Sequence, residues 1–218
     1  MDEISNQYQE DYFSWQSKIG EFGGKANLFK FERYIGTSDK VLDYGCGGGF
    51  LLKALNCEIK AGIEINPVIQ SPDGVTIFKN LKEISQQFGT ESFDVVISNH
   101  ALEHIDNPAN ALKECFQMLK PGGKAIIVVP SESHRIKYVP DDINKHIVTF
   151  APINLGNLLT LTGFKVISVK RLFHKWPPGY ESMAKINWKL FHYVAYIYGF
   201  YKSSSIQLIA IAEKPIRQ

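Results

Sequence analysis

The fold of this chain is decided by one stretch, Val41-Leu42-Asp43-Tyr44-Gly45-Cys46-Gly47-Gly48-Gly49-Phe50-Leu51-Leu52. It predicts a short buried strand, a glycine turn and the first turn of a helix. Glycines at 45, 47 and 49 have no Cβ atom, so the backbone can turn tightly and a ligand can lie against its peptide groups. The following helix presents free N–H donors at its N-terminus. This arrangement is typical of a nucleotide-type cofactor site at the carboxyl end of a first strand.

The spacing of the glycines narrows the class of cofactor. A dinucleotide fingerprint that starts at Gly45 needs a third glycine at position 50, which is Phe50. No Lys-Ser/Thr pair follows, so the turn is not a P-loop. Asp43 would repel a phosphate, but it can accept hydrogen bonds from a cationic or amino-acid-like ligand. Glu64 ends a second apolar run, and a carboxylate there suits the two hydroxyls of a ribose.

Four motifs stand in a characteristic order along the chain. They are Asp43 to Gly49, then Glu64, then Phe93-Asp94-Val95-Val96 with Leu102-Glu103-His104-Ile105, and finally Leu119-Lys120-Pro121-Gly122-Gly123. From about Val41 to Phe164 the chain therefore resembles class I S-adenosylmethionine-dependent methyltransferases of the small-molecule (type 11) group. The resemblance implies S-adenosyl-L-methionine as cofactor and methyl transfer as activity. The alternative is a doubly wound domain whose glycine turn binds nothing.

Alternating strand and helix patterns predict a single α/β domain. We expect strands at 40–44, 59–64, 75–78, 93–98, 124–130, 164–171 and 206–212, and helices near 49–56, 80–88, 108–119 and 152–163. The resemblance implies a Rossmann-like three-layer sandwich whose seven-stranded, mostly parallel sheet takes an antiparallel last strand between the fifth and sixth. The 218 residues divide into an N-terminal helical lid (1–36), a core (37–172), an aromatic helical insertion (173–205) and the last strand (206–214).

Composition limits the partners and the compartment. A net charge of +2 without a Lys/Arg-rich run argues against nucleic acid as a partner. Three cysteines without a CxxC motif indicate a reducing compartment, and the acidic, non-apolar start does not look like a signal peptide. We therefore expect a cytoplasmic protein, monomeric or homodimeric, that acts on a small-molecule acceptor.

The resemblance implies which residues hold the cofactor. The glycine turn with its aspartate faces the methionine portion, the carboxylate after the second strand binds the ribose, and the residue beside it lies against the adenine. Many relatives place an acidic residue after the third strand, near the adenine amino group; this chain has an asparagine there. The residues expected to contact the cofactor are Asp43, Gly45, Cys46, Gly47, Gly49, Glu64, Ile65, Asn80, Leu81, Ser98 and Asn99.

Methyl transfer from a sulfonium is an in-line displacement in which the donor carries its own activation, so the protein mainly aligns the reactants. A general base is needed only when the acceptor must lose a proton. The candidates are His100, just past the fourth strand, and His134 and His146 in the long loop 131–150. His104 is expected to be structural.

A metal-dependent mechanism is not expected from the sequence. Asp141 and Asp142 have oxygen ligands suited to a hard cation. The fourth strand, however, ends in Ser98-Asn99, where catechol-type enzymes place an aspartate. A solvated loop is therefore the preferred reading of residues 141–144.

The aromatic insertion leaves three readings open. One helical face is lined, at helical spacing, by Ile186, Leu190, Val194, Ile197 and Tyr201. It is widened beyond a normal surface stripe by Trp188, Phe191, Ala195 and Tyr198, so we expect something other than water to cover it. The longest uncharged aromatic run, residues 191–201, is too short to span a bilayer. The segment is either a helical cover over the acceptor, a dimer surface or an interfacial membrane attachment. In the first reading it works together with the N-terminal lid, whose Tyr8 and Tyr12 would face the cleft.

The expected function is methyl transfer to a small molecule, by analogy a sugar or related precursor of surface polysaccharide or natural product. One alternative is a quinone-type C-methyltransferase at the membrane face. The other is a non-catalytic module that binds the cofactor or its product.

Overall fold

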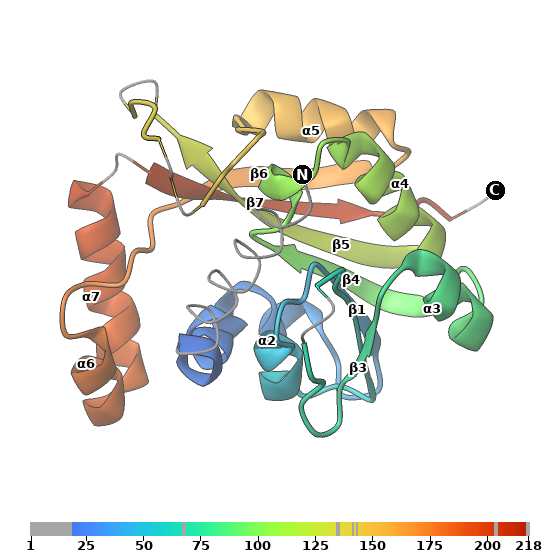
Figure 1. Ribbon diagram of the computed structural model, residues 1–218, viewed down its shortest axis with the longest axis horizontal. Coiled ribbons are helices and arrows are strands. Elements are labelled where there is room, and N and C mark those ends of the chain that lie inside the picture. The colour runs from blue at the N-terminus through green and yellow to red at the C-terminus, as the bar shows by residue number, and fades with distance from the viewer. Residues whose placement is uncertain are drawn as a thin grey trace.

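The computed structural model describes residues 19–66, 69–133, 136–140, 142, 144–202 and 205–216. These residues form a seven-stranded sheet in the order β3-β2-β1-β4-β5-β7-β6, between two layers of helices (Figure 1). The strands are β1 (Lys40–Tyr44), β2 (Ile59–Ile63), β3 (Thr76–Phe78), β4 (Phe93–Asn99), β5 (Leu119–Glu132), β6 (Lys165–Leu172) and β7 (Ser205–Glu213). After the helical residues 19–27, the α-helices of the described chain are α2 (Phe50–Ala54), α3 (Leu81–Phe88), α4 (Pro108–Met118), α5 (Pro152–Leu161), α6 (Tyr180–Ile186) and α7 (Trp188–Tyr201).

The strand directions confirm the expected Rossmann-like topology. β1 pairs in parallel with β2 and β4, and β4 pairs in parallel with β5. β7 lies between β5 and β6 and is antiparallel to both, as the resemblance implied. The carboxyl ends of β1, β2, β4 and β5 therefore meet at one edge of the sheet, which is where ligands bind in open α/β folds.

The fifth strand differs from its expected bounds. It begins at Leu119 instead of residue 124, because Phe93 of β4 pairs with Leu119 before the register shifts to Val95 and Lys124. The Pro-Gly-Gly turn expected to precede the strand is therefore an irregularity inside it, where Gly122 takes a φ of +81°. The consequence is local, because the pairing from Lys124 onward is regular.

Alternating side chains of the central strands build a core on each face of the sheet. In β5, Ala125, Ile127 and Val129 belong to the core shared with α3, α4 and α5. Ile126 and Val128 belong to the opposite core, which contains residues of α2. Strands buried on both faces appear in the sequence as continuous apolar runs, and this is why β4 and β5 could be recognised.

The aromatic insertion folds as two helices, with the side chain of Asn187 capping the second. Only part of the predicted face is buried: Ile186 is 78% and Tyr201 79% exposed, and Leu190 and Ile197 are also exposed. The residues turned inward are Phe191 and Ala195, from the widened part of that face, together with Gly199. A Cβ on Gly199 would lie 2.8 Å from the backbone of Phe173, so small residues at this spacing let α7 approach the preceding chain closely.

The insertion packs against the helical residues 19–27 of the N-terminal segment. The ring of Phe22 lies 4.8–5.5 Å, centroid to centroid, from the rings of Trp176, Tyr180, Trp188 and Phe191. Two segments about 160 residues apart thus form one aromatic cluster. Figure 1 shows the N-terminal helix, in blue, on the same side of the sheet as α6 and α7. Tyr8 and Tyr12 lie outside the described residues.

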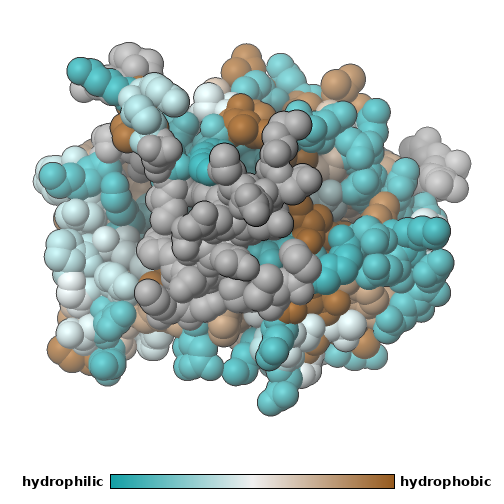
Figure 2. Space-filling model, viewed as in Figure 1, coloured by the Kyte–Doolittle hydropathy of each residue, from teal (hydrophilic) through white to brown (hydrophobic). Residues whose placement is uncertain are grey.

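The outer surface of the described chain is mixed in character. On the face seen in Figure 2, hydrophobic residues are interspersed with hydrophilic ones around the grey atoms. Among the described residues, no helix has the length and apolar character needed to cross a bilayer.

Candidate active site

The glycine turn after β1 has the backbone conformation that the sequence predicted. Gly45, Gly47 and Gly49 have φ values of +79°, +51° and +70°, in the left-handed region that favours glycine. The N–H groups of Gly45 and Cys46 both donate to the carbonyl of Ile63, at 2.9 and 3.0 Å. A Cβ on Gly45 would collide with the side chain of Ala101. The turn is therefore held against β2 and leaves no space for a side chain at position 45.

Glu64 is fixed beside this turn. One carboxylate oxygen accepts a hydrogen bond from the Gly47 N–H at 3.0 Å, and the other accepts one from the Asn66 N–H at 2.9 Å. Glu64 directly follows β2, and its own N–H donates to the carbonyl of Phe78 in β3. The carboxylate is thus preorganised at the carboxyl edge of the sheet, where the resemblance places the ribose ligand.

Asp43 is buried without a partner for one of its oxygens. Its side chain lies at the end of β1 and the residue is 2% exposed. Within the described chain, Oδ1 has no hydrogen bond. Burial and the nearby charge of Glu64 raise the pKa of Asp43 to about 8. A buried polar atom of this kind is costly unless a donor meets it, so the carboxyl fits the cationic amino-acid portion of the expected cofactor.

The remaining predicted cofactor residues are placed in different ways. Ile65 is 74% exposed beside Glu64, as a side chain that covers a flat ring would be. The side-chain oxygen of Asn80 accepts a hydrogen bond from Glu83 N at 3.1 Å and so caps α3, of which Leu81 is the first residue. Ser98 does not fit its prediction: it is fully buried, and its hydroxyl donates to the carbonyl of Tyr44. It joins β4 to β1 instead of facing a ligand.

A cavity of about 1260 Å³ opens beside the glycine turn. Its described lining comes from the turn, from the ends of β4 and β5, from the loop before α5, from the N-terminal helical residues and from the start of the insertion. Cys46, Asn99, His100 and Trp176 are among the lining residues, whereas Asp43, Glu64 and Ile65 are not. Single-ligand pockets usually measure about 300–1,000 Å³, so this cavity has room for an acceptor beyond the methionine end of a cofactor.

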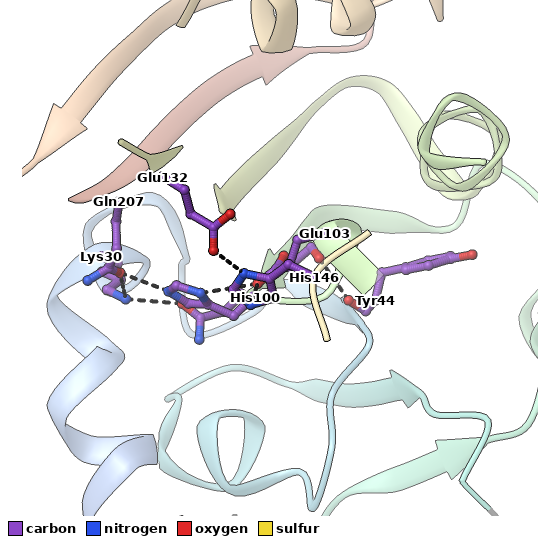
Figure 3. A network of polar contacts seen from close by, with 9 residues as sticks. Lys30, Tyr44, His100, Glu103, Glu132, His146 and Gln207 are labelled. Carbon is purple, nitrogen blue, oxygen red and sulfur yellow. Dashed lines mark hydrogen bonds and ion pairs between the residues drawn. The ribbon is translucent and has the colours of Figure 1, made fainter. Parts of the chain in front are cut away.

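A polar network of buried and partly buried side chains lines the cavity, and Figure 3 shows its contacts. We call this part of the lining the inner end of the cavity, because Lys30 and Glu103 there are buried. His100 Nε2 lies 3.1 Å from Gln207 Oε1, and His100 Nδ1 lies 3.2 Å from Glu103 Oε1. Lys30 Nζ donates to the same Gln207 oxygen at 2.5 Å and to Asn99 Oδ1 at 3.1 Å. His100 has a φ of +57°, a conformation uncommon for a side-chain-bearing residue and frequent at functional sites.

Lys30 is one of the site residues that the sequence did not reveal, together with Gln207 and Glu132. It is 3% exposed, although lysine is almost never buried without a partner. Burial lowers the pKa of Lys30 to about 7, and the negative charge of Glu103 opposes this shift. Its sequence environment, between Phe29 and Phe31, gave no chemical signal except that a lysine interrupts an aromatic run.

Glu103 and His146 come together from two separate loops. Glu103 is fully buried in the short 3₁₀ segment Leu102–His104 after β4. Its carbonyl accepts hydrogen bonds from Ile147 N at 3.0 Å and Val148 N at 3.1 Å, which ties the loop before α5 to this segment. His146 Nδ1 lies 2.7 Å from Glu132 Oε1, and Nε2 lies 4.0 Å from Glu103 Oε1. Burial lowers the pKa of the neighbouring His104.

Two of the three predicted bases therefore lie in one cavity. His100 and His146 both lie close to Glu103, while His134 is outside the described residues. The sequence placed His146 only in a loop of functional length. The backbone hydrogen bonds to Glu103 are what bring it to the end of β4.

The glycine turn, the fixed carboxylate after β2 and a cavity at the carboxyl edge of a sheet with β7 inserted between β5 and β6 define an S-adenosylmethionine-dependent methyltransferase. Comparison with known families agrees: a profile described as "Methyltransferase domain" matches residues 12–169. The chain belongs to this methyltransferase family.

Individual relatives are more distant. The ubiquinone biosynthesis O-methyltransferase of Rickettsia canadensis (strain McKiel) is 26% identical over 212 residues, covering 81% of this chain and 86% of that protein. A solved S-adenosylmethionine-dependent methyltransferase from Archaeoglobus fulgidus is 20% identical, with a TM-score of 0.65 over 93% of this chain and 99% of that one. Phosphoethanolamine N-methyltransferase 2 of Haemonchus contortus, solved with S-adenosylmethionine, is 16% identical, with a TM-score of 0.58 over 94% and 60%. At these identities the structures show a shared fold.

Proposed function

We propose that this methyltransferase acts on a hydroxyl group of a small acceptor bound against His100. The observation that carries the proposal is the His100–Glu103 pair at the inner end of the cavity, with 3.2 Å between Nδ1 and the carboxylate. A hydroxyl must lose its proton when it is methylated, and a histidine backed by a carboxylate is suited to receive it. An acceptor that needs no deprotonation would have no use for such a pair.

A phenolic acceptor is the favoured chemical class. The cavity combines polar groups at its inner end with apolar walls that include Phe50, Ile136 and Trp176. Such walls suit the flat body of an aromatic ring, while the polar end suits its hydroxyl. The relatives named ubiquinone biosynthesis O-methyltransferases support O-methylation over the C-methylation considered from the sequence. A sugar acceptor remains the competing class, because Asn144, Lys137 and Lys145 also line the cavity.

The roles of the chain's own residues follow from their positions. S-adenosylmethionine, when bound, supplies a methyl group on a positively charged sulfur. Asp43, Glu64 and the glycine turn would bind and orient it, since they offer a buried carboxyl, a fixed carboxylate and backbone groups without obstructing side chains. Gln207 Oε1 accepts a hydrogen bond from His100 Nε2–H and so holds the ring. Nδ1, which lies 3.2 Å from Glu103 Oε1, takes the acceptor proton as the oxygen attacks the methyl carbon, and the carboxylate stabilises the imidazolium that forms. The aromatic insertion and N-terminal helix exclude water from the acceptor side.

The test is methyl transfer with isotope-labelled S-adenosylmethionine to a panel of simple catechols, monophenols and nucleotide sugars, followed by mass spectrometry. We expect labelled methyl on a phenolic oxygen. His100→Ala should lower turnover by about 10²-fold or more while leaving cofactor affinity within about twofold. His192→Ala is the matched control, because His192 lies in the aromatic cluster and not in the cavity lining. Methylation of sugars alone would overturn the phenolic assignment, and wild-type turnover in His100→Ala would overturn the role of the base.

A further inference from the structure

Two histidines and a glutamate lie close together at the inner end of the cavity, in an arrangement that could bind a metal ion. Glu103, His104 and His146 each offer one ligand atom, and these atoms lie within 4.8 Å of one another. Glu103 and His104 are neighbours in the 3₁₀ segment after β4, and His146 comes from the loop before α5. The two backbone hydrogen bonds from residues 147 and 148 to the Glu103 carbonyl hold the two elements together. The grouping is therefore built by the fold.

The carboxylate at the centre of the group lacks hydrogen bonds. Glu103 is fully buried, and neither of its oxygens accepts a hydrogen bond of acceptable geometry from the described residues. An ionised carboxylate removed from water is strongly disfavoured unless a positive charge or several donors meet it. The nearest partner is His100, whose Nδ1 lies 3.2 Å from Oε1. Oε2 has no hydrogen-bond donor among the described residues, so the carboxylate keeps a free acceptor beside the imidazoles of His104 and His146.

The orientation of His146 fits a metal ligand. His146 Nδ1 lies 2.7 Å from Glu132 Oε1. A carboxylate can only accept, so Nδ1–H donates a hydrogen bond to it and Nε2 carries the lone pair. Nε2 is the nitrogen that faces Glu103, at 4.0 Å (Figure 3). Metal-binding histidines commonly donate their second ring N–H to a carboxylate in this way, because it fixes the tautomer and the ring orientation.

The hydrogen-bond partners of His100 also indicate a cation beside Glu103. The Gln207 side-chain nitrogen donates to the carbonyl of His174, so the Gln207 oxygen is the atom that faces Lys30 and His100. That oxygen can only accept, so His100 Nε2 must donate to it. A neutral His100 would then present its Nδ1 lone pair to a Glu103 oxygen 3.2 Å away. Two acceptors at this distance repel unless a proton or a cation neutralises them.

We propose that Glu103, His104 and His146 form a binding site for a divalent transition-metal ion, with His100 beside it. Two imidazoles and one carboxylate are the ligand set of many catalytic Zn²⁺ sites with an open coordination position, and they suit Mn²⁺ or Fe²⁺ also. Magnesium and calcium prefer all-oxygen sites and fit less well. Ligand atoms around an ion with bonds of about 2.1 Å lie about 3.4 Å apart in a tetrahedral site, so binding must draw these side chains inward by about 1 Å.

These ligands differ from Asp141 and Asp142, the candidate weighed from the sequence and set aside because the fourth strand ends in Ser98-Asn99. The function of the metal site, which rests on the proposed O-methylation, is to bind the acceptor hydroxyl at the open position. All three ligand residues line the cavity, together with His100 and Glu132. A bound divalent ion lowers the pKa of a coordinated hydroxyl. The hydroxyl proton then passes to His100, the oxygen forms its bond to the methyl carbon, and the electron pair of the broken carbon–sulfur bond stays on sulfur.

Metal binding can be measured without any knowledge of the acceptor. The untagged full chain is stripped with a chelator, dialysed and titrated with ZnCl₂ by calorimetry, with metal content measured by mass spectrometry after desalting. We expect one ion per chain. Glu103→Gln and His146→Ala should each weaken binding by at least about tenfold, the loss usual even for supporting residues of metal sites. His192→Ala is the control for adventitious histidine binding. It should bind as the wild type does.

Two further readouts keep the proposal falsifiable if a variant folds poorly. Circular dichroism of each variant checks its fold, and Co²⁺ in place of zinc gives visible absorption bands that depend on ligand geometry. Loss of those bands in a folded His104→Gln protein supports the site. Substoichiometric binding by the wild type, or unchanged binding in Glu103→Gln and His146→Ala, overturns it. If the ion binds but phenols are not methylated, the metal site stands and the proposed acceptor falls. If chelator-treated protein without bound metal methylates phenols at the full rate, the phenolic acceptor stands and the proposed role of the metal ion falls.

Discussion

The unpartnered carboxyl of Asp43 makes the affinity for cofactor depend on pH in a specific way. The pKa of Asp43 is raised to about 8 by burial, assisted by the charge of Glu64. A cationic ligand group at this position favours the ionised carboxylate and so lowers its pKa in the complex. Binding must therefore release a proton when the pH is below about 8. The affinity rises with pH up to that value and is constant above it.

The size of the effect follows from the shift. Below pH 8 the ionised fraction of Asp43 falls about tenfold per pH unit, so at pH 6 about 1% of the free protein is competent. The Kd for S-adenosylhomocysteine should then be about 100-fold weaker at pH 6 than at pH 9. Calorimetry from pH 6 to 9, in two buffers of different ionisation enthalpy, measures both the Kd and the number of protons released. Close to one proton should be released at pH 6.5.

The matched control is Asp43→Asn, which keeps the shape of the side chain and cannot titrate. Its affinity should be low and nearly independent of pH, so any slope that remains belongs to the ligand's own amino group. Equal Kd values at pH 6 and pH 9 in the wild type would refute the reasoning, as would an unchanged slope in Asp43→Asn.

A stability measurement gives an independent check of the direction of the Asp43 pKa shift. Because the folded-state pKa is above the unfolded value near 3.8, this group lowers stability as the pH rises from about 4 to 8. Asp43→Asn should therefore raise the Tm more at pH 8 than at pH 5.

Three further substitutions test the architecture. Gly45→Ala should abolish measurable cofactor binding in calorimetry, because position 45 combines a φ of +79° with a collision against Ala101; unchanged affinity would contradict the proposed turn geometry. Lys30→Met should raise the acceptor KM by about tenfold or more with cofactor Kd unchanged, since it removes the donor that joins two partly buried amide oxygens, those of Asn99 and Gln207; an unaltered KM would remove Lys30 from the acceptor site. Phe191→Ala should lower the free energy of unfolding by about 3–5 kcal/mol in urea denaturation, because Phe191 is fully buried. Ile186→Ala is its control and should cost less than about 0.5 kcal/mol, because Ile186 is 78% exposed; equal losses would show that the inward face of α6 and α7 is misassigned.

Most of the fold could be predicted because its signals are local. The apolar runs of β1, β4 and β5, the glycine turn at 45–49 and the proline at the start of α4 each report on a few neighbouring residues. The fifth strand was misjudged at its start, because the pairing of Leu119 with Phe93 depends on the partner strand and not on the residues of β5. In the insertion, helical periodicity predicted helix correctly, but the predicted face was too wide to show which of its residues are buried. The aromatic residues of the insertion recur on every side, so the choice of face depended on which residues were small enough to allow close packing.

The functional site also has one part that local sequence predicts and one part that depends on contacts between distant residues. The glycine turn and Glu64 could be recognised in the sequence. A backbone that turns tightly beside a ligand requires glycines at fixed positions, and a carboxylate directly after a strand lies at the carboxyl edge of the sheet. The inner end of the cavity depends on distant contacts. Lys30 meets a glutamine 177 positions along the chain, and His146 reaches Glu103 only because a loop is pinned to the end of β4. Burial of Lys30, Asp43 and Glu103 likewise exists only in the folded protein. The sequence alone indicated the cofactor class, because the glycine spacing excludes a dinucleotide fingerprint and a P-loop, and the order of four motifs resembles S-adenosylmethionine-dependent methyltransferases. The tertiary structure decided which charged groups face the acceptor, because desolvation and long-range packing set their partners.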